Sequence, residues 1–266
     1  MMKSAKRVIL VLFLGLCVPA TLFAQTLSDT EKERRWMVQI VDTLFDGETI
    51  WLEADGHDFL GIEMEGFDGH TGRAAIVVHG IGVHPNWEQV IRPLRVGLTE
   101  YGWHTLSIQM PILPNEAGGL EYVPLFDEVA GRFEAAIDFL QARGNREIVI
   151  IAHSMGSSMT MRYMDDVAEP PVKALVLVGM QGGRENMVHD NVSALNKVKL
   201  PVLELYGSDD LPGVVDFAAR KASAAYTGGN KGYRQMMVDG ANHFFDGLDE
   251  TLVELVGQWL AGLDSS

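Results

Sequence analysis

Cysteine is almost absent from this chain of 266 residues, since only Cys17 is present. A single thiol cannot form an intrachain disulfide, so a small fold held together by disulfide bonds is excluded. Cys17 also lies in an N-terminal segment that we expect to be removed, which would leave the mature chain without cysteine. A hydrophobic core must therefore stabilise the fold, and 47% apolar residues over this length suffice for one large core.

The N-terminal segment has the pattern of an export signal. Three basic residues stand within the first seven, an apolar stretch covers residues 8–18, and the small residue Ala24 precedes Gln25. We therefore predict that residues 1–24 are a signal peptide. The alternative is an uncleaved membrane anchor, but the stretch up to Ala24 is short for a membrane span and contains Pro19. An exported chain without disulfides fits a bacterial periplasmic or secreted protein.

Positive charge is also scarce. The chain has 21 Lys and Arg against 36 Asp and Glu, and losing three basic residues with the signal would take the formal charge from −15 to −18. Such a chain repels phosphate backbones and anionic lipid headgroups. We therefore expect no nucleic-acid partner, and no membrane association after the signal is cleaved.

The rest of the chain has the pattern of one domain preceded by a short extension. Residues 25–47 contain an amphipathic helix pattern over residues 28–45. Residues 48–53 and 58–65 alternate in polarity and predict an antiparallel hairpin. Strand and helix patterns then alternate to the C-terminus. For residues 48–266 this predicts an α/β fold with a mostly parallel sheet of about eight strands and helices on both faces.

The elements expected after the hairpin follow from hydrophobic periodicity and from turn residues. The predicted strands cover residues 74–79, 105–109, 146–152, 173–179, 201–207 and 233–238. The predicted helices cover residues 86–100, 123–143, 157–165, 214–225 and 248–263.

The most informative stretch is residues 148–156, IVIIAHSMG, where a strand ends at a serine between small residues. As strand, turn and helix it predicts a nucleophile elbow with Ser154 at the apex. A serine at that point takes a strained left-handed backbone conformation, and the strand and the following helix approach closely. Ala152 and Gly156 are small enough for this approach. His153 beside the serine is interpreted as packing within the elbow. The alternative interpretation of the whole motif is a chance turn after a buried strand.

An acid and a histidine follow two later strands. The penultimate predicted strand leads into Asp209 and Asp210, and the last leads to His243. Open α/β sheets place their sites at these C-terminal strand ends. The preceding predicted strand, residues 173–179, is followed by a loop without a carboxylate. The acid is therefore predicted to be Asp209 or Asp210. The G-x-x-D spacing from Gly207 favours Asp210, with Asp209 as the fallback.

With a serine elbow, an acid and a histidine in this order, the sequence resembles the α/β-hydrolase superfamily from about residue 48 onward. More narrowly, it is similar to a poorly characterised bacterial family of exported α/β-hydrolase-like proteins. The resemblance implies an oxyanion hole formed by the N–H groups of Met155 and of a residue in the glycine-bearing turn after residues 74–79. That residue is Ile81 or, as second choice, Gly82, with His79 as a packed residue that shapes the turn.

The resemblance also bears on the cover of the site. In this fold a cap domain usually enters after the strand that follows the nucleophile helix. Here residues 181–200 separate that strand from the next, which is room for one helix. We therefore expect no cap domain and an open site.

These residues predict acyl transfer to water. His243 takes the proton of Ser154 as the serine attacks a carbonyl, Asp210 orients the imidazole, and the N–H groups of Ile81 and Met155 bind the oxyanion. The predicted protein is a serine hydrolase that cleaves an ester, thioester or amide bond of a small-molecule acyl substrate. We expect no cofactor and no metal, because the histidines show no H-x-x-x-H or H-E-x-x-H spacing.

Two alternatives use the same residues. One is a noncatalytic binding or scaffold protein that retains the hydrolase fold, since fold alone does not establish activity. The other is an acyltransferase or peptidase with the same triad. The triad does not distinguish these enzymes, because the loops around the site determine which acceptor and which leaving group are used. An activated serine would distinguish the enzymes from the scaffold.

Overall fold

The computed structural model describes residues 27–183 and 189–263. The predicted signal peptide, residues 1–24, lies outside the described residues and stays a prediction. Within the described part of the chain, no helix is both long enough and apolar enough to cross a membrane.

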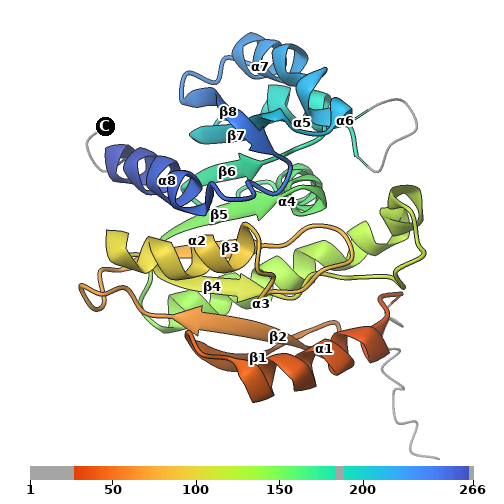
Figure 1. The fold of residues 1–266 in the computed structure, drawn as a ribbon, viewed down its shortest axis with the longest axis vertical. Coiled ribbons are helices and arrows are strands. Elements are labelled where there is room, and N and C mark those ends of the chain that lie inside the picture. The colour runs from red at the N-terminus through yellow and green to blue at the C-terminus, as the bar shows by residue number, and fades with distance from the viewer. Residues whose placement is uncertain (1–26, 184–188, 264–266) are drawn as a thin grey trace, which may run out of the picture.

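An eight-stranded sheet forms the centre of the molecule, in the order β1-β2-β4-β3-β5-β6-β7-β8 (Figure 1). The pairs β1–β2 and β2–β4 are antiparallel, and all other neighbours are parallel. The predicted mostly parallel sheet and its leading hairpin are therefore confirmed. The strands are β1 (Glu48–Ala54), β2 (His57–Met64), β3 (Arg73–Val78), β4 (His104–Ile108), β5 (Glu147–His153), β6 (Ala174–Val178), β7 (Val202–Asp209) and β8 (Tyr233–Asn242).

Helices follow most strands, as the sequence pattern predicts. The α-helices of the described residues are α1 (Thr30–Thr43), α2 (Ile91–Gly97), α3 (Val129–Ala142), α4 (Met155–Asp166), α5 (Asn191–Lys197), α6 (Pro212–Val215), α7 (Ala218–Thr227) and α8 (Asp249–Leu263). Two 3₁₀ segments, η1 (Leu98–Tyr101) and η2 (Gly119–Glu128), adjoin α2 and α3.

The central strands are buried on both faces because helices cover both sides of the sheet. Alternate residues of β3 enter different clusters: Ile76 and Val78 pack with α3 and α4, whereas Ala75 and Val77 pack with α2 and α8. In Figure 1, α2 and α8 lie in front of the sheet and α3 lies behind it. Strands buried on two faces need continuous apolar residues, which is the composition of β3, β5 and β6.

Three predicted helices differ from the observed ones. The helix expected from residue 86 begins at Ile91, because Val90 has a φ of +62° and ends a series of turns. The helix expected from residue 123 divides at Val129, where a 3₁₀ segment containing Pro124 passes into α3. The helix expected over residues 214–225 is divided between α6 and α7.

The N-terminal extension packs against the domain through α1. The side chain of Asp29 accepts a hydrogen bond from the N–H of Lys32 at 3.0 Å and caps the helix. Buried Glu33 forms an ion pair with Arg132 of α3, with 2.9 Å between Oε1 and Nη2. Ile40 packs against β2. The observed helix therefore falls within the predicted range of 28–45, two residues shorter at each end.

The connection from β6 to β7 runs past the C-terminal ends of the strands. Among its described residues, α5 is the only helix. The expected absence of a cap domain therefore holds for the described part of the chain. The strand ends of β3, β5, β7 and β8 carry the residues that the sequence analysis singled out.

Candidate active site

Ser154 stands at a sharp turn between β5 and α4. Its φ of 55° and ψ of −121° are unfavourable for a residue with a side chain. The start of α4 lies so close to the end of β3 that a Cβ on Gly156 would lie 2.4 Å from the carbonyl oxygen of His79. Ala152 is buried, and its carbonyl accepts a hydrogen bond from Ser157 Oγ at 2.9 Å. Glycine at position 156 is therefore required by the backbone, and strain at a residue such as Ser154 is typical of functional sites.

The structure brings Ser154, Asp210 and His243 together. Nε2 of His243 lies 2.9 Å from Ser154 Oγ, and its Nδ1 lies 2.6 Å from Asp210 Oδ1. All three side chains are buried, with exposures of 9%, 8% and 7% respectively. Because a carboxylate only accepts, Nδ1 carries the proton and Nε2 can accept the serine hydroxyl proton. The arrangement is that of a nucleophile, a base and a group that orients the base.

The two candidate acids occupy different environments. Asp209 ends β7, is exposed and accepts a hydrogen bond from Ser208 Oγ at 3.2 Å. Asp210 is buried, and its Oδ1 also accepts the N–H of Leu211 at 2.6 Å. An irregularity in the β7–β8 pairing between Gly207 and Asp209 precedes the turn to Asp210. Geometry therefore places Asp210, the first choice from sequence, against the histidine.

Glycine at the end of β6 makes room for the histidine. Gly179 has a φ of +59°, and a Cβ there would lie 3.0 Å from the imidazole ring of His243. A larger residue would displace this ring from Ser154. The loop after β6 thus contributes space to the site, although it contributes no carboxylate.

The two residues expected to form the oxyanion hole border one cavity with Ser154. Ile81 follows β3 and Met155 begins α4, and both line the cavity beside the serine. A helix N-terminus leaves N–H groups such as that of Met155 without intrahelical partners. His79 fixes the turn before Ile81: its Nδ1 donates to the Gly80 carbonyl at 2.8 Å, and its Nε2 accepts the N–H of Met110 at 2.9 Å.

His153 supports the loop that carries His243. Its Nε2 donates to the main-chain carbonyl of His243 at 2.9 Å, and the two rings have centroids 4.9 Å apart. From the sequence alone, His153 is interpretable only as packing within the elbow, because its hydrogen-bond partner lies 90 residues away. Burial, and secondarily the neighbouring His243, lower the pKa of His153 to about 4, so the ring is neutral at pH 7.

Acidification should destabilise the protein through its buried histidines. Burial also lowers the pKa of His79, to about 3, whereas unfolded histidine titrates near 6.5. From pH 6.5 down to about 4 only the unfolded chain binds these protons, so stability is lost as the pH falls. Between pH 7 and pH 5, protonation of each of these two histidines in the unfolded chain should lower the free energy of unfolding by about 2 kcal/mol.

Urea unfolding at pH 7 and pH 5 measures this loss. In His153→Gln, which keeps a donor for the His243 carbonyl, the drop in the free energy of unfolding should be about 2 kcal/mol smaller than in the unmodified protein. His70→Gln, which changes an exposed histidine, is the control. Equal drops in the unmodified protein and His153→Gln would contradict the assignment.

A profile of the family described as "Protein of unknown function (DUF3530)" matches residues 19–120 and 125–261. The chain belongs to this family. No curated protein matches this DUF3530 chain significantly.

Solved structures similar to this DUF3530 protein share its fold. Est1E from Butyrivibrio proteoclasticus has a TM-score of 0.64 and 15% identity, covering 82% of this chain and 99% of that one. An alpha-beta serine hydrolase homologue from Coxiella burnetii has a TM-score of 0.62 and 17% identity, covering 80% and 98%. The esterase domain of a Rhodothermus marinus protein has a TM-score of 0.58 and 15% identity, covering 79% and 98%. The predicted α/β-hydrolase fold is confirmed.

A small cavity of about 200 Å³ opens beside Ser154 in this DUF3530 protein. Only part of its lining is predictable from the sequence, because several of these residues come from the β6–β7 connection and from the second turn of α4. The lining consists of Ile81, Gly119, Ser154, Met155, Ser158, Gln181, Gly183, His189 and Asn191.

Exposed apolar side chains stand near this cavity. Leu120 follows Gly119 of the cavity lining, Leu211 follows Asp210, and Phe244 follows His243 with its ring centroid 5.2 Å from that imidazole. The site therefore combines a small cavity that carries a few polar side chains with exposed apolar side chains outside it.

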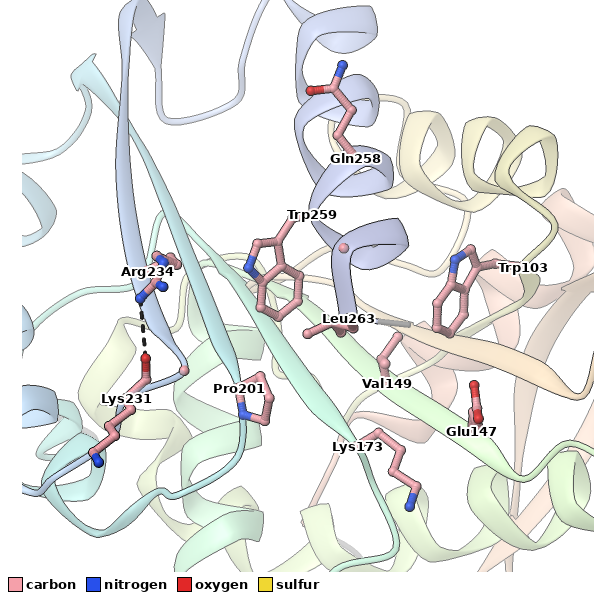
Figure 2. A pocket seen from close by; sticks show the side chains of 12 residues that line it. Trp103, Glu147, Val149, Lys173, Pro201, Lys231, Arg234, Gln258, Trp259 and Leu263 are labelled. Carbon is pink, nitrogen blue, oxygen red and sulfur yellow. Dashed lines mark hydrogen bonds between the residues drawn. The ribbon is translucent and has the colours of Figure 1, made fainter. Parts of the chain in front are cut away.

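A larger cavity, of about 910 Å³, lies at the opposite edge of the sheet (Figure 2). It is lined by Glu147 at the start of β5, by residues that precede later strands, and by the end of α8. Trp103 and Trp259 project into it, whereas Lys173 and Lys231 extend away from the two indoles in Figure 2. Ligand sites require polar groups that converge. The site is therefore assigned to the smaller cavity.

Proposed function

We propose that this protein is a serine hydrolase that cleaves carboxylic esters through an acyl-enzyme. The observation that carries the proposal is the position of His243, which is hydrogen-bonded to Ser154 on one side and to Asp210 on the other. The fold shared with esterases adds support at the level of architecture.

In the proposed reaction, Ser154 Oγ attacks the carbonyl carbon of the ester while His243 Nε2 takes its proton. The imidazolium that forms is stabilised by Asp210, and it then gives the proton to the departing alcohol. A water molecule, deprotonated by the same histidine, hydrolyses the acyl-enzyme and regenerates Ser154. This chemistry needs no metal and no cofactor.

The negative charge on the carbonyl oxygen requires donors. In the proposal, these are the main-chain N–H groups of Ile81 and Met155. Both residues border the cavity beside Ser154, and each such donor is worth about 3 kcal/mol to the transition state.

The proposal includes export. The basic and apolar pattern of residues 1–24 supports a cleaved signal, and the acidic composition supports a periplasmic or secreted protein without nucleic-acid or membrane partners. The substrate in this proposal is a small acyl ester.

A fluorophosphonate probe tests the function directly. The purified mature chain should react at Ser154, as shown by mapping the modified peptide, and His243→Ala should abolish the reaction. The intact mass from the same sample should place the N-terminus at Gln25. A well-folded chain that does not react would favour a noncatalytic binding protein.

A further inference from the structure

The cavity beside Ser154 has a second serine on its wall. Ser158 lies four residues after Ser154, in the first turns of α4, and both serines line the cavity. Ser158 is buried and lines the cavity. The neighbouring Ser157 points elsewhere, since its Oγ donates to the carbonyl of Ala152.

Asn191 holds the oxygen of Ser158 from the opposite side. The Nδ2 of Asn191, the first residue of α5, donates to Ser158 Oγ and to the main-chain carbonyl of Gln181, both at 2.8 Å. Because a carbonyl only accepts, the atom facing Gln181 must be the amide nitrogen, which fixes the orientation of the side chain. Asn191 is 1% exposed, so this arrangement is held inside the protein.

The hydroxyl hydrogen of Ser158 is left available. Ser158 Oγ accepts the bond from Asn191, and a hydroxyl also has one hydrogen to donate. Within residues 27–183 and 189–263, no acceptor is hydrogen-bonded to that hydrogen. The cavity wall therefore presents a donor one helical turn from the reacting serine.

The size of the cavity and the Ser158 hydroxyl on its wall together restrict what can fill it. Its volume of about 200 Å³ is below the range of drug-sized ligand sites, so it holds a short group. A purely aliphatic group would displace water from Ser158 and leave its hydroxyl unpaired, which disfavours binding. An oxygen atom in the group would accept the free hydrogen.

We propose that Ser158, positioned by Asn191, selects esters whose short group carries an oxygen that accepts a hydrogen bond, such as an alkoxy or hydroxy oxygen. This inference rests on the proposed ester hydrolysis. The short group can belong to the acyl part or to the alcohol part of the ester, because both parts flank the carbonyl that Ser154 attacks.

Matched ester pairs distinguish these two sources. In the acyl arm, p-nitrophenyl methoxyacetate is compared with p-nitrophenyl butyrate, in which a methylene replaces the ether oxygen. In the alcohol arm, 2-methoxyethyl acetate is compared with butyl acetate. The quantity measured is the ratio of kcat/KM between the oxygen-bearing and the aliphatic ester. Comparing this ratio between variants cancels differences in intrinsic reactivity.

Ser158→Ala should lower this ratio about tenfold in one arm, the effect of one neutral hydrogen bond. The arm that responds identifies the part of the ester that occupies the cavity. Ser157→Ala, which removes a hydroxyl at the adjacent position of α4, should leave the ratio unchanged. A control that responds as strongly as Ser158→Ala would overturn the proposal, because the effect would then be a general disturbance of α4.

Two further outcomes separate this inference from the proposed function. Hydrolysis by the unmodified protein with equal ratios in Ser158→Ala, in both arms, would overturn the role of Ser158 and leave the hydrolase intact. No hydrolysis together with no fluorophosphonate reaction at Ser154 would overturn the hydrolase, and the selectivity with it.

Discussion

Ser154→Ala will lower kcat for ester hydrolysis by about 10⁶-fold, the loss expected for a serine nucleophile that acts as one unit with its histidine. The hydroxyl oxygen is the only heavy atom removed, so the residual rate comes from substrate binding and from the oxyanion donors. Alanine keeps the Cβ of serine, and it should tolerate the φ of 55° about as well as serine does. The fold should therefore remain intact.

Initial rates on a p-nitrophenyl ester measure the loss, and circular dichroism with thermal unfolding reports the fold. Ser157→Ala is the matched control, because it removes a hydroxyl three residues away that bonds to Ala152 instead of His243. Its rate should stay far above that of Ser154→Ala. Retained hydrolysis in Ser154→Ala would contradict the assignment of the nucleophile.

The elbow was predictable because its constraints are local. The sharp turn from β5 into α4 gives Ser154 a positive φ, and the close approach of α4 to the end of β3 requires glycine at position 156. The sheet was predictable for a related reason. Strands buried on two faces must be apolar throughout, and residues at their C-terminal ends must meet at one edge.

Other features depend on contacts between distant segments. Asn191 lies 33 residues from Ser158, and its role is not predictable from the sequence, since nothing local marks an asparagine as the partner of a serine hydroxyl.

The start of α2 is also not predictable from local sequence. Val90 is a β-branched residue with positive φ, which local preference opposes, but it is fully buried in the core. Packing overrides local propensity there.

Asp210→Asn will lower kcat by about 10⁴-fold, whereas Asp209→Asn will lower it less than about tenfold. The reason is the tautomer of His243. Asp210 accepts the Nδ1 proton at 2.6 Å, which leaves Nε2 free to accept from Ser154. An asparagine amide that donates to Nδ1 would move the ring proton to Nε2, where it blocks proton transfer from the serine. Asp209 is exposed and makes no contact with the ring, so its charge is screened by solvent.

The comparison of these variants also tests whether the carboxylate acts through its charge alone or through a directional hydrogen bond to His243. Both changes remove one negative charge from neighbouring positions, so a loss caused by net charge alone would be similar in the two. A loss confined to Asp210→Asn requires a directional bond to the imidazole, which only the buried carboxylate forms. Steady-state rates at pH 8 for both proteins decide between these explanations. A larger loss in Asp209→Asn would transfer the role to Asp209, and it would require a turn after β7 different from the one described.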